Sequence, residues 1–282
     1  MTDVAAPLAG IRVVTLAPNV PGPVAAARLR DLGAEVRKVE PPSGDPLNAT
    51  TPAWYADLHR GMTVDTIDLK TPEGRARLDE RLREADVLLT SSRPSALVRL
   101  GLGWPDLHER FPSLVHVAIV GELPPNEEHA GHDLTYVAQL GLLDPPAMPR
   151  TLTADLAGAE RAVSATIAAL FARTRDGAGH GRGSRTLVSL REAAETFALP
   201  LAHGMTAPGG TLSGAFPGYR TYPVVGGWIA IAALEPHFWK RMRDLLGGGE
   251  ANADFAAAFA QHDGAYWTAW ATEHDMPLIA FS

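Results

Sequence analysis

The sequence contains no cysteine. Disulfides, thiolate metal sites and thiol nucleophiles are therefore excluded together, which agrees with a reducing compartment such as the cytoplasm. The sequence also has no excess of basic residues, because 25 Lys and Arg stand against 32 Asp and Glu, for a formal net charge of -7. Since nucleic-acid binding depends on basic surface, this balance disfavours a nucleic-acid partner.

Long apolar runs and targeting signals are missing as well. No apolar run approaches the roughly 20 residues that a membrane-spanning helix needs. The N-terminus has no basic region ahead of an apolar stretch, which a signal peptide would show. We therefore expect a cytoplasmic protein with no membrane partner. Its 282 residues, 46% of them apolar and 20% charged, suffice for a large core.

Strand-like and helix-like segments alternate in the first half of the chain. The pattern predicts strands at 11–16, 36–39, 66–69, 87–90 and 114–120, and helices at 24–32, 73–85 and 105–110. Such alternation indicates an α/β domain with a parallel sheet, whose ligands lie near the carboxyl ends of the strands. No glycine-rich dinucleotide fingerprint or P-loop follows a strand, so we expect a sheet that is Rossmann-like in shape only.

The second half has a different rhythm. Helical spacing predicts a long helix over 155–175, then a strand at 186–190 and a helix at 191–199. A Gly/Pro/Ser-rich loop over 203–216 separates these from a hairpin at 218–233, a helix at 236–246 and a weakly helical tail. We therefore predict two domains, a large Rossmann-like domain over 1–202 and a small α+β domain over 203–282.

Several segments, in their order along the chain, carry a resemblance to a known family. They are Leu32-Gly33-Ala34-Glu35-Val36-Arg37-Lys38-Val39-Glu40, Gly44-Asp45-Pro46, Asp68-Leu69-Lys70-Thr71-Pro72-Glu73-Gly74, Arg93-Pro94, Gly131-His132-Asp133 and Leu234-Glu235-Pro236-His237-Phe238. The sequence resembles the family III CoA-transferases (CaiB/BaiF-like), and its motifs are closest to the branch of α-methylacyl-CoA racemase. The resemblance reaches to about Leu246.

The resemblance implies a fold, a substrate and a partner. A Rossmann-like large domain binds coenzyme A, a small α+β domain covers the site, and two protomers form an interlocked homodimer. Coenzyme A enters as the thioester of an acyl substrate, and no metal or redox cofactor is expected. Family members usually continue where this chain ends, soon after Leu278, so we expect a C-terminally shortened form of the fold.

Asp155 matches the carboxylate that the family's branches share. It stands at the head of the long predicted helix, where free N–H groups and the helix dipole stabilise a negative charge. A simple capping role is the alternative. By the resemblance, transferases use this Asp as a nucleophile, and racemases use it to exchange the proton beside the thioester carbonyl. Backbone N–H groups at the same helix start could stabilise the enolate oxygen.

His132 and Glu235 favour the racemase branch. Racemases resemble this chain in having Gly-His-Asp, and Leu-Glu-Pro-x-Phe resembles their form of the segment whose Glu partners the catalytic His. A surface histidine and a charge that merely precedes the helix after Pro236 are the alternatives. Two acid/base groups on either side of a planar enolate are what α-proton exchange requires.

Coenzyme A binding would need cations, and the resemblance points to Lys38, Arg93 and Arg37, with plain surface charge as the alternative. We first expect a racemase or epimerase of 2-methylacyl-CoA thioesters that uses His132 and Asp155. The second hypothesis is a CoA-transferase with Asp155 as nucleophile. The third is a non-catalytic CoA-binding relative. The acidic loop from Gly121 to Glu128 replaces a glycine-rich one, which disfavours a polyanion nearby.

Overall fold

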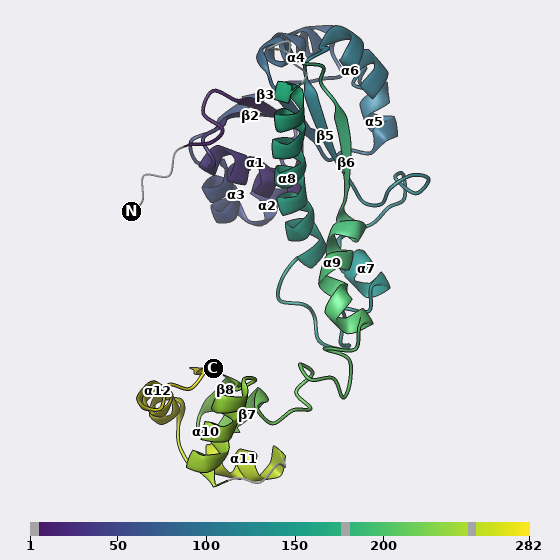
Figure 1. The fold of residues 1–282 in the computed structure, drawn as a ribbon. Helices are drawn as coiled ribbons and strands as arrows, with labels where there is room; N and C mark the ends of the chain where they lie inside the picture. Colours follow the sequence, from purple (N-terminus) through teal and green to yellow (C-terminus); the bar gives the residue numbers. More distant parts are fainter. Residues whose placement is uncertain (1–5, 176–180, 248–251) are drawn as a thin grey trace. The chain divides into compact units, whose positions relative to one another are not determined.

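The computed structural model describes residues 6–175, 181–247 and 252–282. The chain forms two compact units, Met1–Phe197 and Ala198–Ser282 (Figure 1). The boundary between them falls inside helix α9 (Leu190–Ala202), whereas the sequence predicts a boundary at 202/203. Among the described residues no helix is both long and apolar enough to cross a membrane.

The first unit is built on a six-stranded sheet in which all strands are parallel. Its order is β3-β2-β1-β4-β5-β6. The strands are β1 (Arg12–Thr15), β2 (Glu35–Glu40), β3 (Thr63–Thr66), β4 (Val87–Thr90), β5 (Val115–Val120) and β6 (Arg185–Ser189). The predicted α/β class with a parallel sheet is confirmed. The chain order reverses between β1 and β4, so a crevice is expected at their carboxyl ends.

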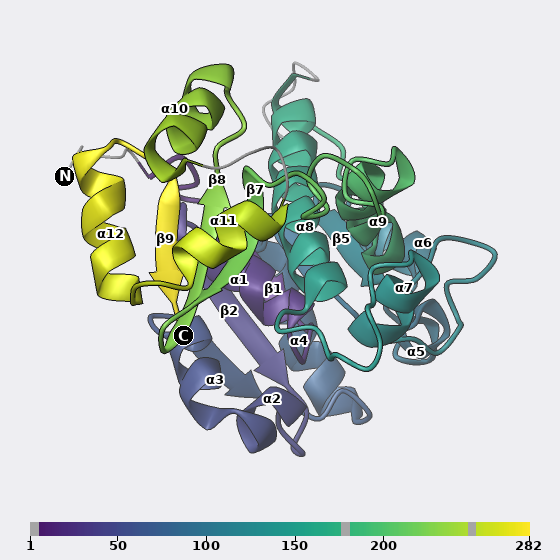
Figure 2. The ribbon, with the colours of Figure 1, turned by 90° about the horizontal axis from the view of Figure 1, so that it is seen from below.

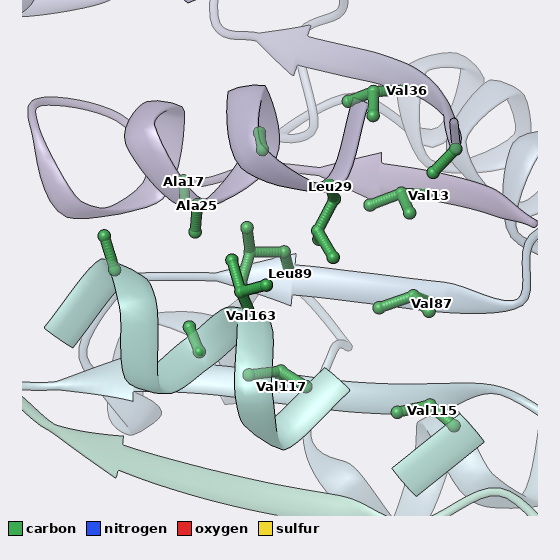
Figure 3. Packing of buried hydrophobic residues seen from close by; sticks show 14 of the residues in the cluster. Val13, Ala17, Ala25, Leu29, Val36, Val87, Leu89, Val115, Val117 and Val163 are labelled. Carbon is green, nitrogen blue, oxygen red and sulfur yellow. The ribbon is translucent and has the colours of Figure 1, made fainter. Parts of the chain in front are cut away.

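Helices cover both faces of this sheet. Helices α1 (Pro21–Asp31) and α8 (Thr153–Arg175) pack on one face, where Leu29 and Val163 meet Val13, Leu89 and Val117 (Figure 3). The other face carries α4 (Pro72–Glu84), α5 (Pro94–Arg99) and α6 (Trp104–Arg110). Burial of strand side chains on both faces explains why β5 is apolar except for His116, which is buried with the rest of the strand. The unit also contains α2 (Pro46–Thr50), α3 (Pro52–His59) and α7 (Asp133–Gln139).

One predicted strand of this unit is wrong. Residues 66–69 were expected to be extended, but β3 ends at Thr66 and a turn follows. The Asp68 side chain accepts a hydrogen bond from the Lys70 amide, and the Thr71 hydroxyl caps α4 by accepting from Gly74. These local side-chain bonds compete with the sheet ladder and turn the chain into the helix.

The second unit has a three-stranded antiparallel sheet in the order β7-β8-β9. Strands β7 (Tyr219–Val224) and β8 (Gly227–Ala232) form the predicted hairpin, and β9 (Leu278–Phe281) was not predicted. The sheet packs with α10 (Pro236–Leu246), α11 (Asn252–Phe259) and α12 (Gly264–Glu273) (Figure 2). Tyr222, Phe259 and Trp267 form the centre of this core.

Candidate active site

A cavity of about 430 Å³ opens at the carboxyl ends of β1, β4 and β5. We call it the reaction cavity. Its walls come from the loops after these strands and from the first turn of α8, at the point where the strand order reverses. The residues on which the argument depends are Arg93, Gly121, Gly131, His132, Tyr136 and Asp155. The cavity therefore lies where α/β sheets bind ligands.

Asp155 is held in this cavity by a neighbouring carboxylate. It lies in the first turn of α8, and its backbone N–H donates to Oδ1 of Asp133 over 3.1 Å. The N–H of Ala154 donates to the same oxygen over 2.6 Å. Asp133 is only 4% exposed and is the first residue of α7, so it joins the starts of two helices. The amides that were expected to stabilise an enolate oxygen are thus already bonded.

The environment of Asp155 makes its carboxyl group a weaker acid than usual. Burial, and then repulsion by the Asp133 carboxylate, raise the pKa of Asp155 from 3.8 to about 6, although His132 acts in the opposite direction. At pH 7.5 the group is still mostly ionised. A poorly solvated carboxylate with a pKa close to neutrality suits both nucleophilic attack and proton exchange.

His132 lies beside Asp155 in the reaction cavity. It immediately precedes α7, and its backbone N–H donates to the Thr135 hydroxyl over 3.0 Å. The residue is exposed, so the imidazole is available to a ligand. His132 and Asp155 line the same cavity, so a ligand bound there can contact both side chains.

Glu235 belongs to the second unit. It precedes α10 as the N-cap residue, it is exposed, and its side chain makes no capping hydrogen bond. His132 belongs to the first unit, and the pairing of Glu235 with it stays a prediction.

Of the three predicted CoA contacts, Arg93 lines the reaction cavity and is exposed. Arg37 instead pairs with Asp65 on β3 over 3.0 Å. Lys38 is 1% exposed, and its ammonium group contacts Glu40 over 3.1 Å, the carboxylate of Asp45, and Nε2 of His59 over 2.9 Å. The charges of Arg37 and Lys38 are therefore already engaged within the protein.

A second cavity of about 340 Å³ adjoins the first, and we call it the apolar cavity. Pro18 and Ser92 line both, so the two cavities are neighbours along the sheet edge. Its walls are mostly aliphatic, and they include the exposed Lys70, which sequence reasoning did not single out. Lys70 lies within one of the motifs that carry the family resemblance, and that motif is the sequence feature by which this lysine could have been identified.

Asp133 and Tyr136 were also missed as site residues, although Asp133 follows His132 directly and Tyr136 stands four positions after it. Their contributions depend on contacts with distant parts of the chain. Among the described residues no group of three or more His, Asp or Glu is placed to hold a metal ion.

Comparison with known proteins agrees with this architecture. The family model described as CoA-transferase family III matches residues 8–278. Succinyl-CoA–D-citramalate CoA-transferase of Chloroflexus aurantiacus is 30% identical over 278 residues, covering 91% of this chain and 68% of that protein. Mouse α-methylacyl-CoA racemase is 32% identical over 254 residues, covering 85% and 65%. The crystal structure of a CaiB/BaiF family protein from Brucella suis superposes with a TM-score of 0.80 at 25% identity, covering 98% and 84%.

Proposed function

Because this chain belongs to CoA-transferase family III, a family of enzymes that act on CoA thioesters, we propose that it transfers coenzyme A between carboxylic acids with Asp155 as nucleophile. The observation that carries the proposal is the Asp155 carboxylate. It lies partly buried in the reaction cavity, which His132 also lines. Most relatives also bear the names of CoA-transferases, among them the enzymes of Agrobacterium fabrum and human that act on succinate or succinyl-CoA and glutarate.

The proposed reaction has four steps, which the family resemblance supplies. Asp155 attacks the acyl carbonyl of the donor thioester, forming a mixed anhydride and releasing the CoA thiolate. The thiolate attacks the aspartyl carbonyl, which gives an aspartyl-CoA thioester and frees the donor acid. The acceptor carboxylate then attacks this thioester and displaces the thiolate. The thiolate finally attacks the acceptor's carbonyl in the second anhydride, which restores Asp155 and forms the new thioester.

The two adjoining cavities suggest how the thioester is placed. We propose that the apolar cavity receives the nucleotide end of coenzyme A and that the reaction cavity receives the acyl group. Lys70 and Arg93 are exposed cations at the two cavities and can pair with phosphate. Lys38 would then act mainly by holding the wall of the apolar cavity in place.

A second candidate function, racemisation of a 2-methylacyl-CoA, is favoured by one observation, namely that His132 and Asp155 share a cavity. One group would remove the α-proton and the other would return a proton to the opposite face of the enolate. The raised pKa of Asp155, about 6, lies in the range that such a group needs.

Two assays separate these functions. Succinyl-CoA would be offered with a panel of carboxylates, and new thioesters would be followed by chromatography. We expect transfer that is lost in Asp155→Asn and retained in His132→Ala, with the exposed Asp144→Asn as an active control. A 2-methylacyl-CoA in heavy water would instead show deuterium at the α-carbon if the racemase reading holds, and either substitution would abolish it. Transfer that survives Asp155→Asn contradicts the proposal.

A further inference from the structure

Tyr136 is a polar group in the reaction cavity to which neither candidate reaction has yet given a role. The residue is 3% exposed, and it lines the cavity from the first turn of α7. Its hydroxyl makes no hydrogen bond to a described residue, and it is not one of the polar atoms sealed from solvent. By contrast, the equally buried Tyr222 donates to the carbonyl of Pro217 over 2.9 Å. A buried tyrosine normally finds such a partner within the protein.

Two glycines make the space that this hydroxyl occupies. A Cβ atom built on Gly121 would lie 2.0 Å from the Tyr136 hydroxyl oxygen, and one built on Gly131 would lie 2.4 Å from it. Neither glycine has a positive φ, so backbone conformation does not require glycine at these positions. Glycine is required at both positions for steric reasons. The loop after β5 and the loop before α7 both contact the phenol of Tyr136 and fix the position of its hydroxyl.

The hydroxyl is a permanent hydrogen-bond donor. Burial, followed by repulsion from Glu122 and Asp155, raises the pKa of Tyr136 above its usual value, while Arg93 acts in the opposite direction. The phenol therefore keeps its proton at neutral pH. Tyr136 and Asp155 line the same cavity.

Both candidate reactions need such a donor. Attack on a thioester carbonyl and removal of the α-proton each place negative charge on the carbonyl oxygen, and a pre-positioned donor stabilises it. The amides of Ala154, Asp155 and Leu156 at the start of α8 do not serve, because the first two donate to Asp133 and the third donates to Leu152.

We propose that the Tyr136 hydroxyl donates a hydrogen bond to the carbonyl oxygen of the acyl-CoA substrate, and that Gly121 and Gly131 leave the space that holds it in position. The inference rests on the proposed action on CoA thioesters and holds for transfer and racemisation alike. It adds Tyr136 to Asp155 as a catalytic residue in either reaction.

The test compares wild type with Tyr136→Phe, which keeps the ring and removes only the hydroxyl. Loss of one such donor lowers kcat by about 10²- to 10³-fold. We expect a fall of that order, with KM and the melting temperature nearly unchanged, because no internal hydrogen bond is lost. The acidic limb of kcat/KM, which Asp155 sets, should not move. Tyr266→Phe, on the exposed face of α12, is the matched control.

A kcat within twofold of wild type would overturn the inference. So would a loss that comes with a shifted acidic limb or a lower melting temperature, since the hydroxyl would then act through Asp155 or through the fold. Absence of turnover in the wild type with every thioester would instead refute the proposed function on which the inference rests.

A second variant tests the placement of the hydroxyl without any substrate. Gly121→Ala should destabilise the protein, because the new methyl group would meet the hydroxyl at 2.0 Å, while the nearest ring carbon lies at 3.0 Å. Adding Tyr136→Phe removes the worst contact and should restore part of the stability in urea unfolding. A double variant that is no more stable than Gly121→Ala alone would mean that the hydroxyl does not occupy this space.

Discussion

The pKa of Asp155 predicts that this residue lowers the stability of the protein at neutral pH. A carboxyl group can have a higher pKa in the folded protein than in the unfolded chain. Such a group stabilises the folded state at pH values below its unfolded pKa, and this contribution is lost as the pH rises through its folded pKa. The difference between 3.8 and about 6 corresponds to about 3 kcal/mol at about pH 7.5, with about 1.4 kcal/mol for each pKa unit. Asp155→Asn removes the charge and should therefore be more stable than wild type by up to this amount.

The pH dependence isolates the effect of the charge from other effects of the substitution. At about pH 5 wild-type Asp155 is largely protonated when folded, so the stability gap should shrink to about 1.5 kcal/mol. Urea unfolding of both proteins at the two pH values measures the gap, with the exposed Asp144→Asn as control. A gap that does not change with pH, or that grows as the pH falls, would refute the reasoning. A more stable but inactive variant would show that the carboxylate is kept for chemistry at the expense of stability.

Two further predictions follow from the contacts of the site. Asp133→Asn removes the carboxylate that repels Asp155, so the pKa of Asp155 should fall and the acidic limb of kcat/KM should move to lower pH; an unmoved limb would mean that burial alone raises it. Lys38→Met leaves the buried carboxylate of Asp45 without its cation and should cost about 3–5 kcal/mol in urea unfolding. A loss below about 1 kcal/mol would show that this pair is not buried as the structure has it.

Much of the fold was predictable because it depends on periodicity. The mostly apolar strand β5 and the long helix α8 are both clear in the sequence, and they place Asp155 at a helix start near the sheet edge. Strand β3 was placed three residues late, because its alternating pattern is too short to compete with the turn at Asp68. Strand β9 was missed because it pairs with β8 from the far end of the chain.

The site was predictable in its residues but not in their contacts. Motif similarity identified Asp155 and His132, and the structure places both in one cavity. The capping of α8 by Asp133 joins residues 22 positions apart, and no local pattern encodes it. A lysine in a strand ordinarily indicates surface, yet the fold surrounds Lys38 with Glu40, Asp45 and His59. Such contacts arise only from tertiary structure.

The most direct test of the account is to trap Asp155 during turnover. The protein would be incubated with succinyl-CoA, treated with hydroxylamine and digested, and the peptide that contains Asp155 would be examined by mass spectrometry. The account predicts a hydroxamate on Asp155 that forms only when the thioester is present and persists in His132→Ala. An unmodified Asp155 in a preparation that is transferring coenzyme A would contradict it.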